Sequence, residues 1–186
     1  MDDLIQTSPK AEAFAALLAE LGVTHVVTLP DNTSAPLLDA LRSQETVALH
    51  FGTREGEVIS IAAGLWLGGV SPAIIIQNTG LLESGDALRG TASRMGAPLL
   101  MLVTCRGYGK SRTLGHEPHE VEMDRAALVR ADLDSVAHMT ESTLKAWGVP
   151  FLYLRDPTDL SPIREGWTRA RKEERPVAVL LDTSFT

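Results

Sequence analysis

The sequence has little of what marks several large classes of protein. It contains a single cysteine, Cys105, which excludes a disulfide framework and a metal site built from paired cysteines. A formal net charge of −7 without clustered basic residues argues against a nucleic-acid surface. No apolar run is long enough to span a bilayer, and no glycine-rich phosphate loop of the P-loop or Gly-x-Gly-x-x-Gly type occurs.

The start of the chain is acidic, and its next apolar stretch is broken by Ser8-Pro9, so we expect no signal peptide. We therefore expect a cytoplasmic protein that binds neither membranes nor nucleic acids. The 186 residues, 44% hydrophobic and 22% charged, are typical of a globular protein with a real core. No internal repeat, low-complexity tract or linker interrupts them, which predicts one domain over residues 1–186.

Short apolar segments alternate with helical patterns along the chain. The expected strands cover residues 25–29, 47–51, 73–77, 98–104, 151–154 and 177–181. The expected helices cover residues 9–21, about 33–41, 55–67, 83–94, 120–130, 133–147 and 160–173. Strands that are apolar throughout and alternate with helices indicate a parallel sheet that is covered on both faces. The predicted fold is α/β, a three-layer sandwich around a mostly parallel sheet of about six strands.

Polar residues gather where the expected strands end. Ligands of such sheets usually bind outside the carboxyl ends of the strands. Those ends carry Pro30-Asp31-Asn32, Gly52-Thr53-Arg54-Glu55, Gln77-Asn78-Thr79-Gly80 and Cys105-Arg106-Gly107. The segment 106–118 is polar and glycine-rich without a clear period, so we expect a long loop of the kind that often carries function.

Glu55 stands where an apolar strand gives way to a helix of small and apolar residues. A carboxyl group in such a seam is poorly solvated and could exchange a proton at neutral pH. The alternative is that a glutamate in the first turn of a helix only complements the helix dipole. Glu57, further round the same helix, is expected to be solvated or salt-bridged.

The order of three motifs resembles a known family. Arg54-Glu55-Gly56, then Ile61-Ala62-Ala63-Gly64, then Gln77-Asn78-Thr79-Gly80-Leu81 resembles the pyrimidine-binding domain of thiamine diphosphate-dependent 2-oxo acid decarboxylases. The likeness is greatest to the sulfopyruvate and phosphonopyruvate decarboxylase group, and it covers nearly the full length of the chain. In this family the glutamate lies nine residues before the glycine of the Ala-Ala segment, a spacing that Glu55 and Gly64 keep.

The resemblance implies a cofactor, thiamine diphosphate, and a role for Glu55. Glu55 would hydrogen-bond the N1′ atom of the aminopyrimidine and favour the imino form, which takes the proton from the thiazolium carbon. The implied cofactor-binding residues are Glu55, Gln77, Asn78, Thr79, Gly80 and Leu81, with the glycine allowing a close approach of the backbone. Gln77 would also face the substrate; alternatively, it satisfies backbone groups of its loop.

One part of such an enzyme is missing from the sequence. The family holds Mg²⁺ and the diphosphate with a Gly-Asp-Gly segment and a downstream asparagine. No Gly-Asp-Gly occurs here, and Ser84-Gly85-Asp86-Ala87 lies in an expected helix without the second glycine. We therefore expect no metal ligands in this chain. A separate diphosphate-binding beta subunit would carry Gly-Asp-Gly and Mg²⁺, in a hetero-oligomer of the α2β2 type or larger.

The resemblance also implies residues on the substrate side. Asp31 and Asn32 would reach the substrate of a neighbouring site; alternatively, they form a turn with a helix cap. Arg106 and Arg112 would bind the anionic tail of a small 2-oxo acid, because arginine suits sulfonate or phosphonate oxygens.

His116 and His119 would serve as proton donors during turnover. The alternative for this basic segment is a solvated, mobile loop.

The implied activity is the conversion of a small 2-oxo acid, like sulfopyruvate or phosphonopyruvate, to an aldehyde and carbon dioxide. Two alternatives remain open. The chain could belong to a thiamine diphosphate-dependent carboligase, or it could be a non-catalytic subunit that stabilises or regulates such an enzyme. The intact Glu55 in its Ala-Ala-Gly context favours a catalytic role.

Overall fold

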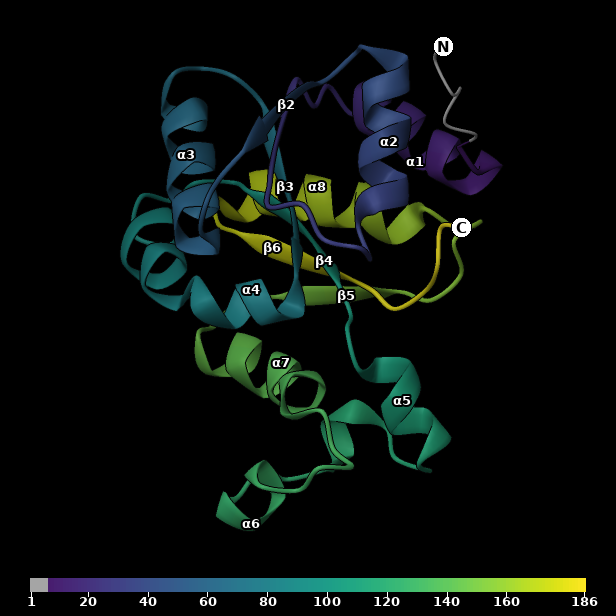
Figure 1. Cartoon of the computed structure of the whole chain (residues 1–186). Coiled ribbons are helices and arrows are strands. Elements are labelled where there is room, and N and C mark those ends of the chain that lie inside the picture. Colours follow the sequence, from purple (N-terminus) through teal and green to yellow (C-terminus); the bar gives the residue numbers. More distant parts are fainter. Residues whose placement is uncertain (1–6) are drawn as a thin grey trace.

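A computed structural model describes residues 7–186 (Figure 1). Its centre is a six-stranded sheet in the order β2-β1-β3-β4-β6-β5, and every neighbouring pair is parallel. The strands are β1 (His25–Thr28), β2 (Ala48–Phe51), β3 (Pro72–Gln77), β4 (Leu100–Thr104), β5 (Phe151–Leu154) and β6 (Val177–Leu181). This sheet confirms the α/β class and the expected strand number.

Helices cover both faces of the sheet, which gives the three layers. They are α1 (Pro9–Glu20), α2 (Ala35–Gln44), α3 (Glu55–Leu67), α4 (Asn78–Glu83), α5 (Tyr108–Thr113), α6 (Arg125–Leu128), α7 (Ser135–Ala146) and α8 (Ser161–Glu173). A π-helical turn, η1 (Ala87–Ala92), and a 3₁₀ turn, η2 (Pro118–Glu120), complete the set. Within the described residues, no helix is long and apolar enough to cross a membrane.

The strands are buried on both faces because their side chains alternate between two cores. In β3, Ala73 and Ile75 pack with α1, α2 and α8, whereas Ile74 and Ile76 pack with α3, α4, η1 and α7. All residues of β4 and β6 are buried in the same alternating way. The continuous apolar runs in the sequence therefore reflect a sheet with no solvent-facing side at its centre.

Local sequence signals set several helix boundaries. Ser8 caps α1 by accepting a hydrogen bond from the Ala11 N–H at 3.2 Å, and Pro9 occupies the first helical position. Gly22, with φ of +78°, follows the end of α1 in the left-handed region that glycine tolerates. Helix α3 begins at Glu55 and ends at Leu67, as the sequence predicts.

The structure corrects one expected loop and the bounds of two expected helices. The segment 106–118 is not a structureless loop, because it contains α5 and leads into η2, whose Glu117–Glu120 capping box holds the turn. The expected helix over 83–94 begins earlier, as α4 directly after β3, and continues as η1. The expected helix over 120–130 is reduced to α6 (Arg125–Leu128). Short helices with buried anchors such as Leu81, Leu88 and Tyr108 have too few turns to show a clear period.

The strand order reverses between β1 and β3. From β1 the chain moves outward to β2 on one side, and then returns to place β3 and the remaining strands on the other side. In an open parallel sheet, such a switch point leaves a crevice outside the carboxyl ends of the two strands. In Figure 1, α4 lies at the end of β3, and α5 and α7 lie below it.

Candidate active site

Glu55 is the first residue of α3, and its side chain is half-buried against the first turns of α4. The close neighbour is Gly80. A Cβ atom placed on Gly80 would lie 2.2 Å from Cγ and 2.5 Å from Oε1 of Glu55, distances that real Cβ atoms do not show. The carboxylate therefore occupies the space that the missing side chain of Gly80 leaves open.

Two other carboxylates fix the backbone around Glu55. Glu57 Oε2 accepts hydrogen bonds from the N–H (2.7 Å) and the hydroxyl (2.8 Å) of Thr53, and these bonds lower the pKa of Glu57. Glu83, from the end of α4, accepts a hydrogen bond from the Gly56 N–H at 2.8 Å and pairs with Arg54. The pKa of Glu83 is lowered, first by its hydrogen bond with Arg54 and then by the Gly56 N–H.

In the described part of the chain, the three glutamates at this turn have different roles: Glu57 and Glu83 accept backbone hydrogen bonds, and Glu55 does not. Glu83 supplies the capping interaction that Arg54, the N-cap residue, does not make with its own side chain. Within the described residues, the hydrogen bonds at this turn are made by Glu57 and Glu83. The Glu55 carboxylate is thus held in position by packing, while its oxygens stay available to a ligand.

Asp31 and Gln77 meet at the switch point. The Gln77 side-chain amide donates to Asp31 Oδ1 and to Thr33 Oγ1, each at 3.3 Å, and its oxygen accepts from the Thr79 hydroxyl at 3.0 Å. Asp31 also closes the turn before α2 by accepting the N–H groups of Thr33 and Ser34. Asp31 therefore serves as a turn cap and also as a partner of Gln77.

Asn78 is fully buried and its amide is used internally. Its Oδ1 accepts the Arg106 N–H at 3.1 Å, and its Nδ2 donates to the Arg106 carbonyl at 3.0 Å and to Thr140 Oγ1 at 3.2 Å. The residue thus ties the end of β3 to the end of β4 and to α7. Leu81 is fully buried in the core next to α3, so it supports the site through packing.

The two predicted substrate arginines lie in different environments. Arg106 is largely exposed, and its Nε lies 3.4 Å from Asp134 Oδ2. Arg112 donates from Nη1 to Asp182 Oδ1 at 2.9 Å, makes a second bond to Asp182 through Nη2, and donates from Nε to Glu117 Oε1 at 3.0 Å. The pKa of Arg112 is raised, first by the hydrogen bonds to Asp182. Arg112 anchors α5 to the end of β6, whereas Arg106 retains exposed donors.

The two predicted histidines lie around η2. His116 is half-buried, and its backbone carbonyl accepts the Ser111 hydroxyl at 2.9 Å. His119 is 44% exposed, and its Nδ1 lies 3.9 Å from Oε1 of Glu141 on α7. A cavity of about 300 Å³ beside His119 is lined by residues of α7 and of the segment 119–123.

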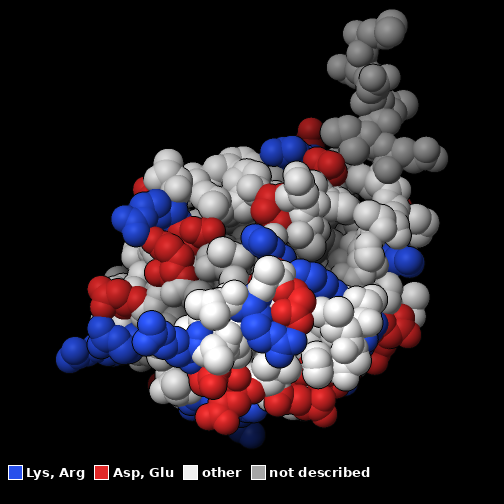
Figure 2. Space-filling model, turned by 60° about the horizontal axis from the view of Figure 1, so that its bottom comes forward, with Lys and Arg blue, Asp and Glu red and all other residues white. Residues whose placement is uncertain are grey.

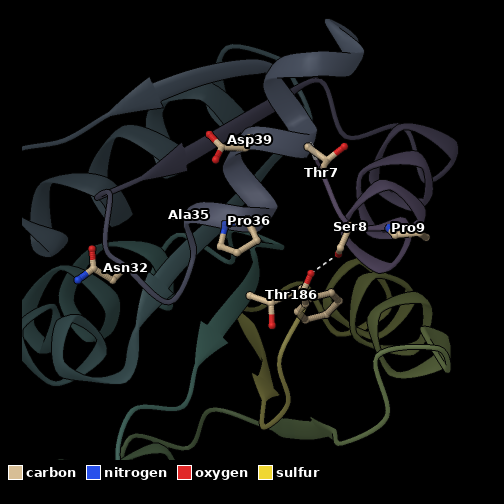
Figure 3. Close-up of a pocket in the computed structure, with 9 residues that line it drawn as sticks. Thr7, Ser8, Pro9, Asn32, Ala35, Pro36, Asp39 and Thr186 are labelled. Atoms are coloured by element: carbon tan, nitrogen blue, oxygen red, sulfur yellow. Dashed lines mark hydrogen bonds between the residues drawn. The ribbon is translucent and has the colours of Figure 1, made fainter. Parts of the chain in front are cut away.

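Asn32 lies apart from the Asp31–Gln77 contact. It is exposed and borders a cavity of about 540 Å³ between the starts of α1 and α2 and residues 185–186 (Figure 3). In Figure 3, the Ser8 hydroxyl donates to the Phe185 carbonyl across one end of this cavity. Of the predicted site residues, the lining of this cavity includes Asn32 alone.

The predicted residues therefore form two groups on the carboxyl edge of the sheet. One group contains Glu55, Gly80, Gln77 and Asp31, and the other contains Arg106, Arg112, His116 and His119. Asn78 connects the groups through the Arg106 backbone. Figure 2 shows basic and acidic side chains interleaved on this side of the molecule, without one continuous basic surface.

Three acidic residues with clear structural roles were missed from the sequence. They are Glu83 at the end of α4, Glu141 on α7 and Asp182 after β6. The side chains of Glu141 and Asp182 are about 5% and 4% exposed, which is unusual for carboxylates. The helical position of Glu141, three residues after the buried His138, is the one signal that could have identified it.

The fold and the Glu55–Gly80 seat define a domain that can present one carboxylate to a flat heterocycle at the edge of a parallel sheet. The model of the thiamine pyrophosphate enzyme family, N-terminal TPP binding domain, matches residues 10–128. The chain belongs to this family.

Several relatives match over most of the chain. It is 28% identical over 177 residues to the sulfopyruvate decarboxylase subunit alpha of Methanothermobacter thermautotrophicus, which covers 94% of this chain and 96% of the relative. The corresponding subunit of Methanococcus maripaludis is 24% identical over 176 residues, with 94% and 95% covered. The phosphonopyruvate decarboxylase of Streptomyces hygroscopicus is 34% identical over 134 residues, and the match spans 72% of this chain but 32% of that enzyme.

A solved structure shares the fold. The 2-oxoglutarate:ferredoxin oxidoreductase from Magnetococcus marinus superposes with a TM-score of 0.64 at 20% sequence identity. The match covers 97% of this chain and 29% of that chain. The six-stranded parallel sheet is thus the fold of a domain that also occurs within a much larger protein.

The residues present fit the aminopyrimidine half of the cofactor. A half-buried carboxylate that packs on a glycine, with its neighbours' carboxylates already satisfied, can hydrogen-bond a ring nitrogen. Metal binding is different. Among residues 7–186, no group of three or more His, Cys, Asp or Glu side chains could hold a metal ion.

Proposed function

We propose that the chain is the alpha subunit of a two-chain thiamine diphosphate-dependent decarboxylase. Its substrate is a small 2-oxo acid that resembles sulfopyruvate or phosphonopyruvate, and its products are an aldehyde and carbon dioxide. The relatives that match over their full length carry the name sulfopyruvate decarboxylase subunit alpha, which supports this proposal. The observation that carries it is the Glu55 carboxylate seated on Gly80.

In this proposal Glu55 shares a hydrogen bond with the N1′ atom of the aminopyrimidine ring and controls its proton. The bound cofactor supplies the carbon nucleophile and accepts the electrons that the departing carboxylate leaves behind. The chain's own contribution is to place the Glu55 carboxylate where it can control this proton. A correctly placed proton-transfer group contributes about 10²- to 10⁴-fold in rate. The contacts of Glu57 and Glu83 support this role by fixing the turn from which Glu55 projects.

Gln77 and the backbone of Thr79 and Gly80 complete the proposed cofactor-facing surface. The contacts with Asp31 and Thr79 hold the Gln77 amide at the switch point, where a ligand of a parallel sheet is expected. Asn78 and Leu81 contribute through burial, since neither presents a free polar group.

The second group of residues faces the substrate in this proposal. Arg106, with exposed donors, binds the anionic tail, while Arg112 organises the segment through Asp182. His116 and His119 donate protons to the reacting group after carbon dioxide has left. Asn32, which lies on another cavity, is assigned to a neighbouring site of the oligomer.

A beta subunit with a Gly-Asp-Gly segment would hold Mg²⁺ and the diphosphate, in an α2β2 or larger assembly. The sequence lacks this segment, and the name of the full-length relatives supports a partner chain. We also propose a cytoplasmic location, for which the lone Cys105 offers support, because its thiol has no partner for a disulfide.

The test is decarboxylation by the assembled complex. The chain, its beta subunit, Mg²⁺ and thiamine diphosphate are mixed with sulfopyruvate or phosphonopyruvate, and carbon dioxide and aldehyde are measured. Glu55→Gln should lower kcat by at least about 10²-fold, whereas Glu165→Gln, an exposed control on α8 away from the site, should leave it unchanged.

Near-normal turnover by the Glu55→Gln variant would exclude the proposed role. Full turnover by the beta subunit alone would favour a non-catalytic subunit. A carbon–carbon bonded product that forms only with an added acceptor aldehyde would favour a carboligase.

A further inference from the structure

Glu141 presents a buried carboxylate with one unpaired oxygen. The Tyr153 hydroxyl lies on the same carboxylate, and the pKa of Tyr153 is raised first by burial and then by its hydrogen bond with Glu141. Glu141 is buried on α7, and its Oε1 atom has no hydrogen-bond partner among residues 7–186. The nearest cationic groups are His119, with Nδ1 3.9 Å from Oε1, and Lys145, with Nζ 3.9 Å from Oε2. A buried carboxylate is costly unless it is paired and hydrogen-bonded, so this arrangement calls for a donor at Oε1.

The segment that carries His119 is fixed by one contact with α7 and by one contact within η2. His138 Nδ1 lies 2.8 Å from the Pro118 carbonyl, and because a carbonyl oxygen can only accept, Nδ1 of His138 carries the proton. The Glu117 N–H donates to Glu120 Oε2 at 3.2 Å as part of the capping box of η2. Pro118 is buried, so His119 begins from a fixed backbone position.

We propose that Glu141 is a positioning residue for His119. The distance of 3.9 Å between His119 Nδ1 and Glu141 Oε1 is roughly 1 Å longer than a charge-assisted hydrogen bond. A small rotation of the exposed imidazole shortens it, so that His119 Nδ1–H donates to Glu141 Oε1. The other ring nitrogen, Nε2, then faces away from α7. A histidine whose Nδ1–H is held by a carboxylate has a defined tautomer and ring orientation, as proton-transfer histidines require.

The other charged groups around His119 are less suited to this task. The cavity beside it is also lined by Glu120, Glu122, His138 and Lys145. Glu120 and Glu122 are exposed, and the Nδ1 of His138 is already bonded to Pro118. Lys145 is 63% exposed and, as a cation, adds positive charge without accepting a hydrogen bond from an imidazole.

The catalytic consequence rests on the proposed function, in which His119 transfers a proton. The pairing itself does not, and it can be tested in the isolated subunit. We would record ¹⁵N shifts of the histidine rings at a pH where the rings are neutral, and assign His119 with the His119→Gln variant. The wild type should show His119 as the Nδ1–H tautomer.

Glu141→Leu removes the acceptor at nearly constant volume and should return His119 to the Nε2–H tautomer that free imidazole side chains favour. Glu122→Gln, an exposed control on the same cavity, should leave the tautomer unchanged. If the leucine variant does not fold, Glu141→Gln should at least weaken the Nδ1–H preference. A wild-type His119 that already shows the free-imidazole tautomer, or one that Glu141 variants do not alter, overturns the inference.

Kinetics of the assembled enzyme separate this inference from the proposed function. Glu141→Gln should lower kcat by roughly tenfold or more with little change in KM, within the about 10²- to 10⁴-fold that proton transfer supplies. Combined with His119→Gln, it should cause no additional loss, because the two residues act as a unit. If His119 shows the Nδ1–H tautomer but the complex decarboxylates no 2-oxo acid, the pairing of His119 with Glu141 stands and the proposed function is wrong.

Discussion

Replacing Gly80 by alanine should displace Glu55 without unfolding the protein. Alanine is the better helix former by about 0.8–1.0 kcal/mol, so intrinsic propensity alone predicts a more stable α4. The structure predicts the opposite balance. The added Cβ would lie 2.2 Å from Glu55 Cγ and 2.6 Å from Cδ, and overpacking of this kind typically costs about 1–3 kcal/mol.

The Glu55 side chain is the part that can yield. It is half-buried and flexible beyond its Cβ, whereas Gly80 is fixed between β3 and the core residue Leu81. We therefore expect a modest net loss of stability and a displacement of the carboxylate by an ångström or more. A misplacement of about 1 Å at a reacting group can cost about 10²-fold in rate.

The assay compares thermal unfolding and kcat/KM of the reconstituted enzyme for Gly80→Ala and Gly109→Ala. Gly109 lies in α5, and an added Cβ there meets nothing within 4 Å, so its variant should retain stability and activity. In a Glu55→Ala background, Gly80→Ala should become neutral or stabilising, because the conflicting side chain is gone. Wild-type kcat/KM for Gly80→Ala would refute the reasoning.

Other substitutions test the surroundings of the site. Glu83→Ala should cost about 1 kcal/mol near neutral pH, because it removes the acceptor that caps α3 at the Gly56 N–H. The hydrogen bond with Arg54 lowers the pKa of Glu83 below its ordinary value of 4.5. The stability that Glu83 adds is therefore present above pH 4.5 and should be lost as the pH falls through the lowered pKa. Urea unfolding of wild type and variant at several pH values measures this loss. Asn78→Ala should lower the free energy of unfolding by about 1–3 kcal/mol, because it leaves the part-buried N–H and carbonyl of Arg106 without their partner; an unchanged urea midpoint would contradict this. Arg112→Ala should cost up to about 3 kcal/mol, because it leaves the buried Asp182 carboxylate with only the more distant Arg155, whose Nε lies 3.5 Å away, as cationic partner. Equal stability of the variant and wild type in the same measurement would argue against the pairing.

The sequence predicted those parts of the fold that depend on long, regular patterns. The six strands are continuous apolar runs, and α3 combines a sharp start at Glu55 with a helix of small and apolar residues. Both signals are local, and the parallel sheet then brings the strand ends together at one edge. For this reason the sequence could predict that Asp31 and Gln77 lie close together, although it could not predict the hydrogen bond between them.

The parts that the sequence did not predict depend on contacts between distant segments. The conversion of 106–118 into α5 and η2 depends on Arg112 reaching Asp182, a residue that follows the last strand. The seat of Glu55 likewise depends on how closely α4 approaches α3, which no local pattern encodes. The role of Gly80 was expected to be access for the cofactor, whereas the structure adds the accommodation of Glu55.

The pairing of β4 with β6 has a consequence for synthesis of the chain. Every residue of β4 is buried, and one of its two edges pairs with Val177–Leu181, which leaves the ribosome after residues 105–176. At about 5–20 residues per second, the edge of an apolar strand waits on the order of 4–15 s for its neighbour. During translation this edge is open to other nascent chains. Expression at a lower temperature, or together with added chaperones, should therefore raise the yield of soluble subunit.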